Sequence, residues 1–149
     1  MRQADVLGED DRLVSVLHER LAAREVCELD GELGVLVAAI GSSHAAANAR
    51  TAQVAAKLAA GTGWAAVTTA FVTGPQPSVP EAANQLRRRG ARRLVIAPFF
   101  LAPGRLTDRV LAYARAADIP MAEPLGAHRL VVETVLDRYD QAVAAQAAA

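Results

Sequence analysis

The stretch VLVAAIGSSHAAAN, residues 35–48, joins an apolar run to a turn of small residues and the start of a helical pattern. The apolar run over residues 34–40 is bounded by glycines, which is typical of a central parallel strand covered on both faces. Small residues between such a strand and a helix leave the first helical N–H groups open to an anion. The stretch therefore predicts an α/β fold with a candidate ligand site at Ser42, Ser43 and His44.

On both sides of this stretch, apolar patterns of strand and helix period alternate along the chain. We expect further strands over residues 64–71 and 93–100, a short fourth strand in IPMAEPLG (119–126), and helices over 10–24, 47–60, 78–89, 106–117 and 128–145, with a frayed AAQAAA end. Right-handed crossovers then place helices on both faces of the sheet. The pattern predicts a three-layer αβα domain with a four-stranded parallel sheet, doubly wound in the flavodoxin-like manner.

Composition limits the classes of partner. The chain has 149 residues, a formal net charge of zero and 52% hydrophobic residues, which indicates a soluble globular domain. Zero net charge gives no reason to expect a nucleic acid or an anionic membrane as partner, and no apolar run is long enough to span a bilayer. Cys27 is the single cysteine, and MRQADVLGEDD is too polar for a signal peptide. We expect a cytoplasmic protein.

Ligands of doubly wound sheets gather beyond the carboxyl ends of the strands. Loops over residues 41–46, 72–77, 101–106 and 126–128 should meet at this edge. Gly41, Ser42 and Ser43 could bind a carboxylate or phosphate there, together with Arg105. Two alternatives stay open: a serine that only caps the helix, and an arginine that is only solvated.

Two histidines, His44 and His128, are candidates for a metal ligand or a base, since neutral imidazole serves as both near neutral pH. Solvated loop histidines are the alternative. The arginines of RRRGARR (residues 87–93) precede the strand expected at 93–100, so we interpret them as a solvated face at the opposite edge. GSSHAAAN lacks the spacing of a phosphate-binding P-loop, no organic cofactor is expected, and the residues alone identify no catalytic group.

Two segments of the chain are similar at a fixed offset. LGEDDRLVSVLHERL (residues 7–21) aligns without a gap to LGAHRLVVETVLDRY (125–139), so that Arg20 pairs with Arg138, 118 residues later. The similarity is either a chance match of amphipathic helices or a repeat of about one domain length. As a repeat, residues 1–30 would resemble the end of a preceding copy, and residues 31–149 would form the α/β domain.

Four motifs in order resemble the sirohydrochlorin cobalto/ferrochelatase family, whose members have the class II chelatase-like fold. They are GSSHAAANA, PSVPEAANQLRRRGARR, GARRLVIAPFFLAPG and PLGAHRLVVETVLDRY, which together cover about residues 34–139. The turn with GSS most resembles the C-terminal half of a two-repeat member. Such members hold the tetrapyrrole between two halves, and short members build the same cleft as homodimers.

The resemblance implies a function in siroheme or cobalamin biosynthesis, the insertion of divalent cobalt or iron, as substrate, into a sirohydrochlorin-type tetrapyrrole. Two family histidines that bind the metal and accept pyrrole protons correspond to Ile40 and Leu106, which can do neither. The chain would therefore be the non-histidine half of the cleft.

On this hypothesis the residues that bind the tetrapyrrole are Gly41, Ser42, Ser43, Arg105 and His128, and the partner is a second chelatase half or a second copy. One alternative is an independent homodimeric enzyme with His44 and His128 as metal ligands. Another is a non-catalytic module that binds a tetrapyrrole or a protein partner.

Overall fold

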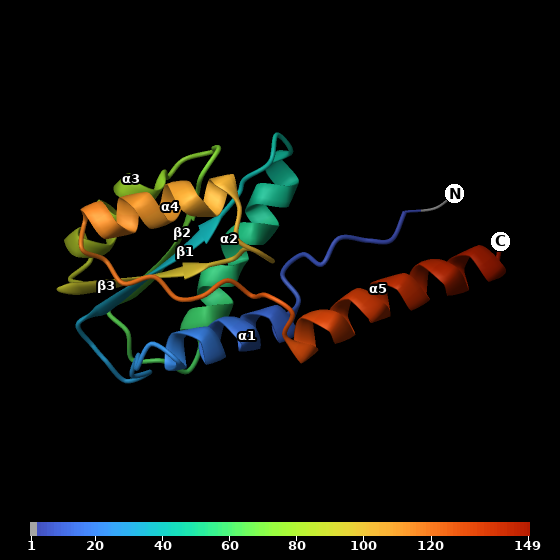
Figure 1. The fold of residues 1–149 in the computed structure, drawn as a ribbon, viewed down its shortest axis with the longest axis horizontal. Helices are drawn as coiled ribbons and strands as arrows, with labels where there is room; N and C mark the ends of the chain where they lie inside the picture. Colours follow the sequence, from blue (N-terminus) through green and yellow to red (C-terminus); the bar gives the residue numbers. More distant parts are fainter. Residues whose placement is uncertain (1–2) are drawn as a thin grey trace.

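The computed structural model describes residues 3–149, and strands alternate with helices along most of this range (Figure 1). The elements are α1 (Asp11–Ala22), β1 (Leu33–Ala39), α2 (Ala45–Ala59), β2 (Ala66–Phe71), α3 (Val79–Arg88), β3 (Arg93–Pro98), α4 (Arg105–Ala116) and α5 (Arg129–Ala147). Their bounds lie close to the predicted ones. The expectation of a frayed end was wrong, because α5 continues to Ala147.

The strands form a parallel sheet in the order β2-β1-β3. Val35 of β1 lies opposite Val67 of β2 and Val95 of β3, and every residue of β1 is buried. An apolar run suits this position because the strand has a neighbour on each side and a helix layer on each face. The prediction of a central buried strand is confirmed.

The predicted fourth strand was wrong, since the sheet in the described residues has three strands. Met121 forms only an isolated parallel bridge with Ile96, whose N–H donates to Pro120 O at 2.9 Å and whose carbonyl accepts from Ala122 N at 2.9 Å. Pro120 and Pro124 have no N–H to donate, so the ladder ends after one residue. The segment lies beside β3 without becoming a strand.

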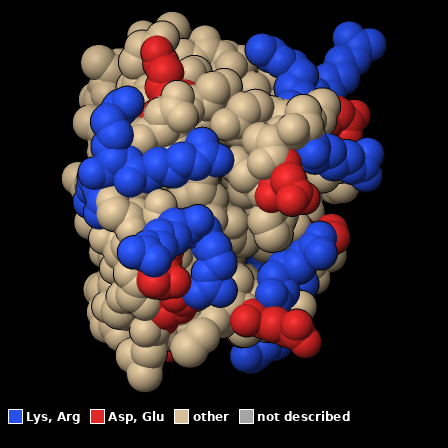
Figure 2. Space-filling view, turned by 90° about the vertical axis from the view of Figure 1, so that its left-hand side faces the viewer, with Lys and Arg blue, Asp and Glu red and all other residues tan. Residues whose placement is uncertain are grey.

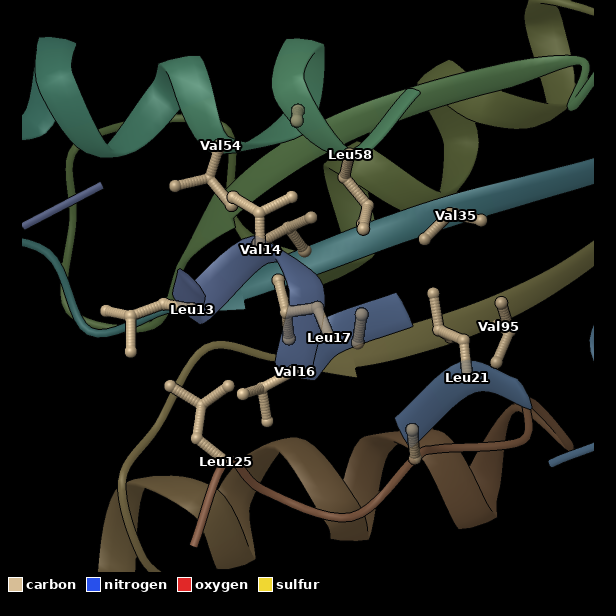
Figure 3. Close-up of a cluster of buried hydrophobic side chains, with 14 of the residues drawn as sticks. Leu13, Val14, Val16, Leu17, Leu21, Val35, Val54, Leu58, Val95 and Leu125 are labelled. Atoms are coloured by element: carbon tan, nitrogen blue, oxygen red, sulfur yellow. The ribbon is translucent and has the colours of Figure 1, made fainter. Parts of the chain in front are cut away.

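Two apolar layers enclose the sheet. The first cluster joins α1 and α2 to one face of the sheet, and the second joins α3 and α4 to the other. Five side chains of α1 point into the first cluster, as Figure 3 shows: Leu13, Val14, Val16, Leu17 and Leu21. Burial of each large apolar side chain contributes about 1.5–3 kcal/mol. The domain boundary at residue 30 stays a prediction, and α1 packs on this sheet as an integral helix.

Asp10 fixes the start of α1 and ties it to α5. Its carboxylate accepts from Arg12 N at 2.9 Å, pairs with Arg12 Nε at 3.0 Å and pairs with Arg138 Nη2 at 3.1 Å. The side-chain hydrogen bond from Arg12, opposed by desolvation, lowers the pKa of Asp10 from 3.8 to about 2. The ionised form is therefore stabilised in the folded protein.

Asp10→Asn should lower the free energy of unfolding at pH 7 by about 2 kcal/mol. A depressed folded-state pKa stabilises the protein above the unfolded pKa near 3.8, and this contribution is lost as the pH falls toward about 2. Urea titrations from pH 7 to pH 2.5 should show a smaller acid-dependent loss in the variant. Asp11→Asn is the control, because the Asp11 side chain is 88% exposed and should contribute little. Equal behaviour of the two variants would contradict the prediction.

The edge of the sheet from which the strands start carries mixed charge. Figure 2 views this side and shows basic and acidic side chains interspersed over it. Arg93, the first residue of β3, pairs with Asp30 at 2.6 Å, and Arg92 pairs with Glu32 at 3.6 Å. The side chains of Arg87, Arg88, Arg89, Arg92 and Arg93 are all exposed. The interpretation of the arginine run as a solvated face is confirmed. Within residues 3–149, every helix is too short or too polar to cross a membrane.

Candidate functional site

Loops from four parts of the chain meet at the carboxyl edge of the sheet. The chain leaves β1 toward α2 on one face and leaves β3 toward α4 on the other, which is where doubly wound sheets open a crevice. Thr73 N donates to Ile40 O at 3.0 Å, and Gly126 N donates to Leu101 O at 2.8 Å. The loops expected at this edge therefore lie together.

We call residues 41–44 the GSSH turn. Its first residue, Gly41, has a backbone conformation and surroundings that admit only glycine. Gly41 has φ +95°, and a Cβ at this position would lie 1.9 Å from Gly74 O of the loop after β2. Thr73 also donates its hydroxyl to Ile40 O at 2.7 Å. The two loops are thus in close contact, and a side chain at Gly41 would separate them.

Asn48 holds the other side of the GSSH turn. Its side-chain oxygen accepts from Ser42 N at 2.8 Å, and its amide nitrogen donates to Ser42 O at 2.7 Å. Both hydrogen-bonding groups of the Ser42 backbone are therefore fixed by one side chain in the first turns of α2. Sequence reasoning did not assign this role to Asn48, although an Asn six residues after a turn serine is a usable signal.

The serines shape the turn and leave polar groups exposed. Ser42 Oγ accepts from His44 N at 3.1 Å, and His44 itself is the N-cap of α2, without a side-chain capping bond. His44 Nδ1 lies 3.4 Å from Ser42 Oγ and from Ser43 Oγ. Since neither serine caps α2, Ser43 Oγ and the His44 ring are available to a ligand at this edge.

His128 has a structural environment that the sequence did not reveal. Its Nδ1 accepts from Leu130 N at 3.1 Å at the start of α5, and its Nε2 lies 2.5 Å from Glu19 of α1. Both ring nitrogens are engaged, so a metal or tetrapyrrole role would require one contact to break. Among residues 3–149, no three His, Cys, Asp or Glu side chains form a group that could hold a metal. Metal binding by His44 and His128 stays a prediction.

The two positions that correspond to family histidines lie at this edge in different environments. Ile40 follows β1 and is 46% exposed, whereas Leu106 in the first turn of α4 packs against the second core cluster. Arg105 precedes it and is exposed, in a position to meet an acidic group. Leu101 is 50% exposed, so Ile40 and Leu101 give the edge an apolar component.

A pocket of about 330 Å³ opens between the N-terminal segment, the first half of α2 and the loop after β3. Its lining is mainly apolar and includes one cation, Arg50, and one carboxylate, Glu9; the large apolar side chains are Leu7, Leu13, Phe99, Leu101 and Leu125. Sequence reasoning missed Arg50 and Leu101, because the N-terminal segment that completes the pocket is remote in sequence. The pocket could take an apolar group that carries an acidic substituent.

Asn48→Ala should lower the free energy of unfolding by about 1–2 kcal/mol, because it leaves the Ser42 N–H and carbonyl without protein partners. It should also mobilise the GSSH turn. Urea denaturation measures the first effect, and amide hydrogen exchange at Ser42 measures the second. Asn84→Ala on α3 is the control, since Asn84 makes only a 3.4 Å contact with Arg87. Unchanged exchange at Ser42 would contradict the assigned role.

Comparisons with known proteins agree with this fold. The CbiX family model matches residues 34–142. The chain is 31% identical over 113 residues to the chloroplastic sirohydrochlorin ferrochelatase of Arabidopsis thaliana, with 70% of this chain and 50% of the relative covered. The chain thus spans about half the length of that curated relative.

Two solved structures share the fold. SirB from Bacillus subtilis with Fe3+ aligns with a TM-score of 0.78 and 19% identity over 93% of this chain and 56% of that one. The sirohydrochlorin chelatase SirB from Bacillus subtilis subspecies spizizenii, in complex with cobalt, aligns with a TM-score of 0.66 and 18% identity over 91% and 51%. The matched family model covers the sheet, the GSSH turn and most of α5. The sequence-based resemblance is therefore confirmed, and the chain belongs to the CbiX family.

Proposed function

We propose that this chain is one half of a sirohydrochlorin-type chelatase and forms one wall of the tetrapyrrole cleft. A second half supplies the histidines, and divalent cobalt or iron is the substrate inserted. One observation carries the proposal: within the residues that match the CbiX family model, Ile40 and Leu106 stand where the resemblance puts histidines. An aliphatic side chain neither ligates a metal nor accepts a pyrrole proton.

The wall offers groups of two kinds to a macrocycle. Ile40 and Leu101 are half exposed and can contact an apolar ring face. The GSSH turn at the N-terminus of α2 can bind a carboxylate through N–H groups, and the guanidinium groups of Arg105 at the start of α4 and Arg50 in α2 can bind others. These groups suit a planar macrocycle with acidic substituents.

The environment of His128 supports the proposal that this chain forms one wall of the cleft, rather than an independent homodimeric enzyme. That enzyme would use His44 and His128 together, and His128 is held by Glu19 and Leu130 N. His44 is exposed and remains the better candidate for a metal contact. A module that binds tetrapyrrole without any chelatase partner is the second candidate, because it too needs no histidine at Ile40 and Leu106.

The test is to mix the purified chain with sirohydrochlorin, with and without Co2+, and to follow the absorbance spectrum. We expect a saturable spectral shift on binding and no metal insertion above the uncatalysed rate. Insertion above that rate would contradict the assignment as the non-histidine half. Absence of any shift would contradict a tetrapyrrole-binding wall. If addition of a second chelatase half restores metal insertion, the result would favour the proposal over a module that only binds tetrapyrrole.

Ile40→His combined with Leu106→His should introduce insertion activity, since it restores imidazole at both positions. The assay is the same cobalt insertion rate, compared with the two single variants. Circular dichroism must show a folded protein, because Leu106 contacts the second core cluster. A folded double variant that binds sirohydrochlorin and stays inert would show that these positions do not correspond to the family histidines.

A further inference from the structure

Helix α5 carries an apolar stripe that no other part of residues 3–149 covers. Figure 1 shows α5 extending away from the sheet, and only Val131 and Thr134 of this helix are buried. The exposed apolar side chains recur every three or four residues and so lie on one side of the helix. We call them the outer stripe; they are Val132, Val135, Leu136, Tyr139 and Val143, 46–61% exposed.

The repeat at 118 residues relates the outer stripe to the core face of α1. Val132 and Val135 correspond to Val14 and Leu17, which are 7% and 0% exposed. Tyr139 corresponds likewise to Leu21, 1% exposed. Helix α1 uses these positions to pack on the sheet and on α2 (Figure 3). The same positions of α5 are apolar and have no sheet against them.

The starts of the two helices are built alike, which favours a structural repeat over a chance match. Asp10 caps α1 by accepting from Arg12 N. His128 stands 118 residues after Asp10 and caps α5 by accepting from Leu130 N, the equivalent of Arg12 N. Both caps accept from the second residue beyond the cap.

The contacts between α1 and α5 are nearly symmetric. When each residue is replaced by its repeat equivalent in the other helix, almost the same contact is found. Glu19 contacts His128, the cap of α5. Its equivalent, Asp137, contacts Arg12 at 2.6 Å, and Arg12 in turn pairs with Asp10, the cap of α1. The helices therefore run in opposite directions and are related by an approximate two-fold axis.

The arginine pair of the repeat follows the same symmetry. Arg20 of α1 donates to Leu125 O, just before α5, at 2.8 Å. Arg138 of α5 donates to Val6 O, just before α1, at 3.2 Å. The repeat equivalent of Leu125 is Leu7, and Val6 is the residue before it. An approximate two-fold axis that relates α1 to α5 would place a second sheet against the outer stripe, as this sheet lies against α1.

We propose that the outer stripe packs on the sheet of a second CbiX-type half, in the position that α1 occupies on this one. The identity of the partner rests on the proposed function. The receiving face is the equivalent of Val35 and Val95 on the sheet and of Val54 and Leu58 on α2. A copy of this chain with its own α1 in place has no such face, so the partner must leave it uncovered.

The test uses the full chain and a tagged probe, residues 25–128 of the same sequence, which lacks both helices. Because α1 normally covers its first core cluster, the probe should be recovered in soluble form only when a helix of the full chain covers that face. The two are coexpressed without sirohydrochlorin or metal and purified through the tag. We expect the full chain to copurify with the probe in a one-to-one complex. Val135→Glu with Tyr139→Glu in the full chain should reduce recovery at least about tenfold, because charge would be buried on the apolar face.

Ala144→Glu is the matched control. Ala144 is exposed on the polar side of the same helix, so this variant should copurify like the parent. Circular dichroism should show both variants folded, since the substituted side chains are exposed. No copurification of the parent chain, or equal recovery of all variants, would overturn the proposal.

A crosslink tests the register and excludes capture of the full chain through its α1. With Cys27→Ser in both partners, Val132→Cys in the full chain should form a disulfide with Val54→Cys in the probe. Position 132 corresponds to Val14, which packs beside Val54 (Figure 3). Ala144→Cys should form none, and absence of the Val132→Cys crosslink would overturn the proposed register.

Different results would contradict the proposed docking of α5 and the proposed function. Loss of the complex with retained sirohydrochlorin binding by the full chain would overturn the docking alone. A complex between halves in a chain that never shifts the sirohydrochlorin spectrum would overturn the proposed function alone.

Discussion

Gly41→Ala is expected to lower the free energy of unfolding by about 4 kcal/mol and to abolish binding of sirohydrochlorin at the GSSH turn. Two effects add. The backbone of Gly41 has φ +95°, which costs a residue with a Cβ about 1 kcal/mol or more. The new Cβ would also lie 1.9 Å from Gly74 O, a backbone atom that moves only if the loop after β2 moves.

Gly90→Ala separates the two effects. Gly90 has φ +101°, nearly the value of Gly41, but no atom lies within 4 Å of the Cβ that would be added. This variant should lose only about 1–2 kcal/mol and should keep its ligand binding. Urea denaturation with a sirohydrochlorin titration measures both. Equal losses in the two variants would show that the contact between the loops is not tight.

Leu17→Ala should lower the free energy of unfolding by about 3 kcal/mol. Leu17 is fully buried in the cluster that joins α1 to the sheet, and its removal leaves a cavity among side chains that cannot close it (Figure 3). Thermal or urea unfolding followed by circular dichroism measures the loss.

Val135→Ala is the matched variant at the repeat-related position of α5. Val135 is 46% exposed, so the isolated chain should lose less than about 0.5 kcal/mol. The contrast would show that α1 belongs to the core of this domain while the same face of α5 does not. A small loss for Leu17→Ala would instead show that α1 adds little to the stability of the sheet.

Most of the fold could be predicted because its signals are local. The apolar run of β1 is read within a few residues and is confirmed. The helix predicted from residue 78 is also found, with Ser78 and Glu81 forming a capping box at the start of α3. The fourth strand failed because its pattern contains Pro120 and Pro124. Whether such a segment pairs depends on which N–H groups face β3, which a pattern of apolar residues does not contain.

The site could be predicted only in part because its contacts join distant segments. The GSSH turn could be located at the end of β1, but the fixing of Gly41 by Gly74 and of Ser42 by Asn48 depends on three-dimensional packing. His128 shows the limit most clearly. Its Nδ1 caps α5 by accepting from Leu130 N, two residues away, but the partner of its Nε2 is Glu19, 109 residues earlier, which its sequence neighbours do not reveal.

The ion pairs between α1 and α5 join segments that are synthesised at very different times. Helix α1 is synthesised before the rest of this domain, yet its apolar face packs only after β1, α2 and β3 are present. Arg12 pairs with Asp137, which follows 125 residues later. The segment from β1 to α4 can meanwhile form from nearer contacts. A nascent chain that lacks α5 therefore holds α1 without its final ion pairs, and completion of the last helix secures the first.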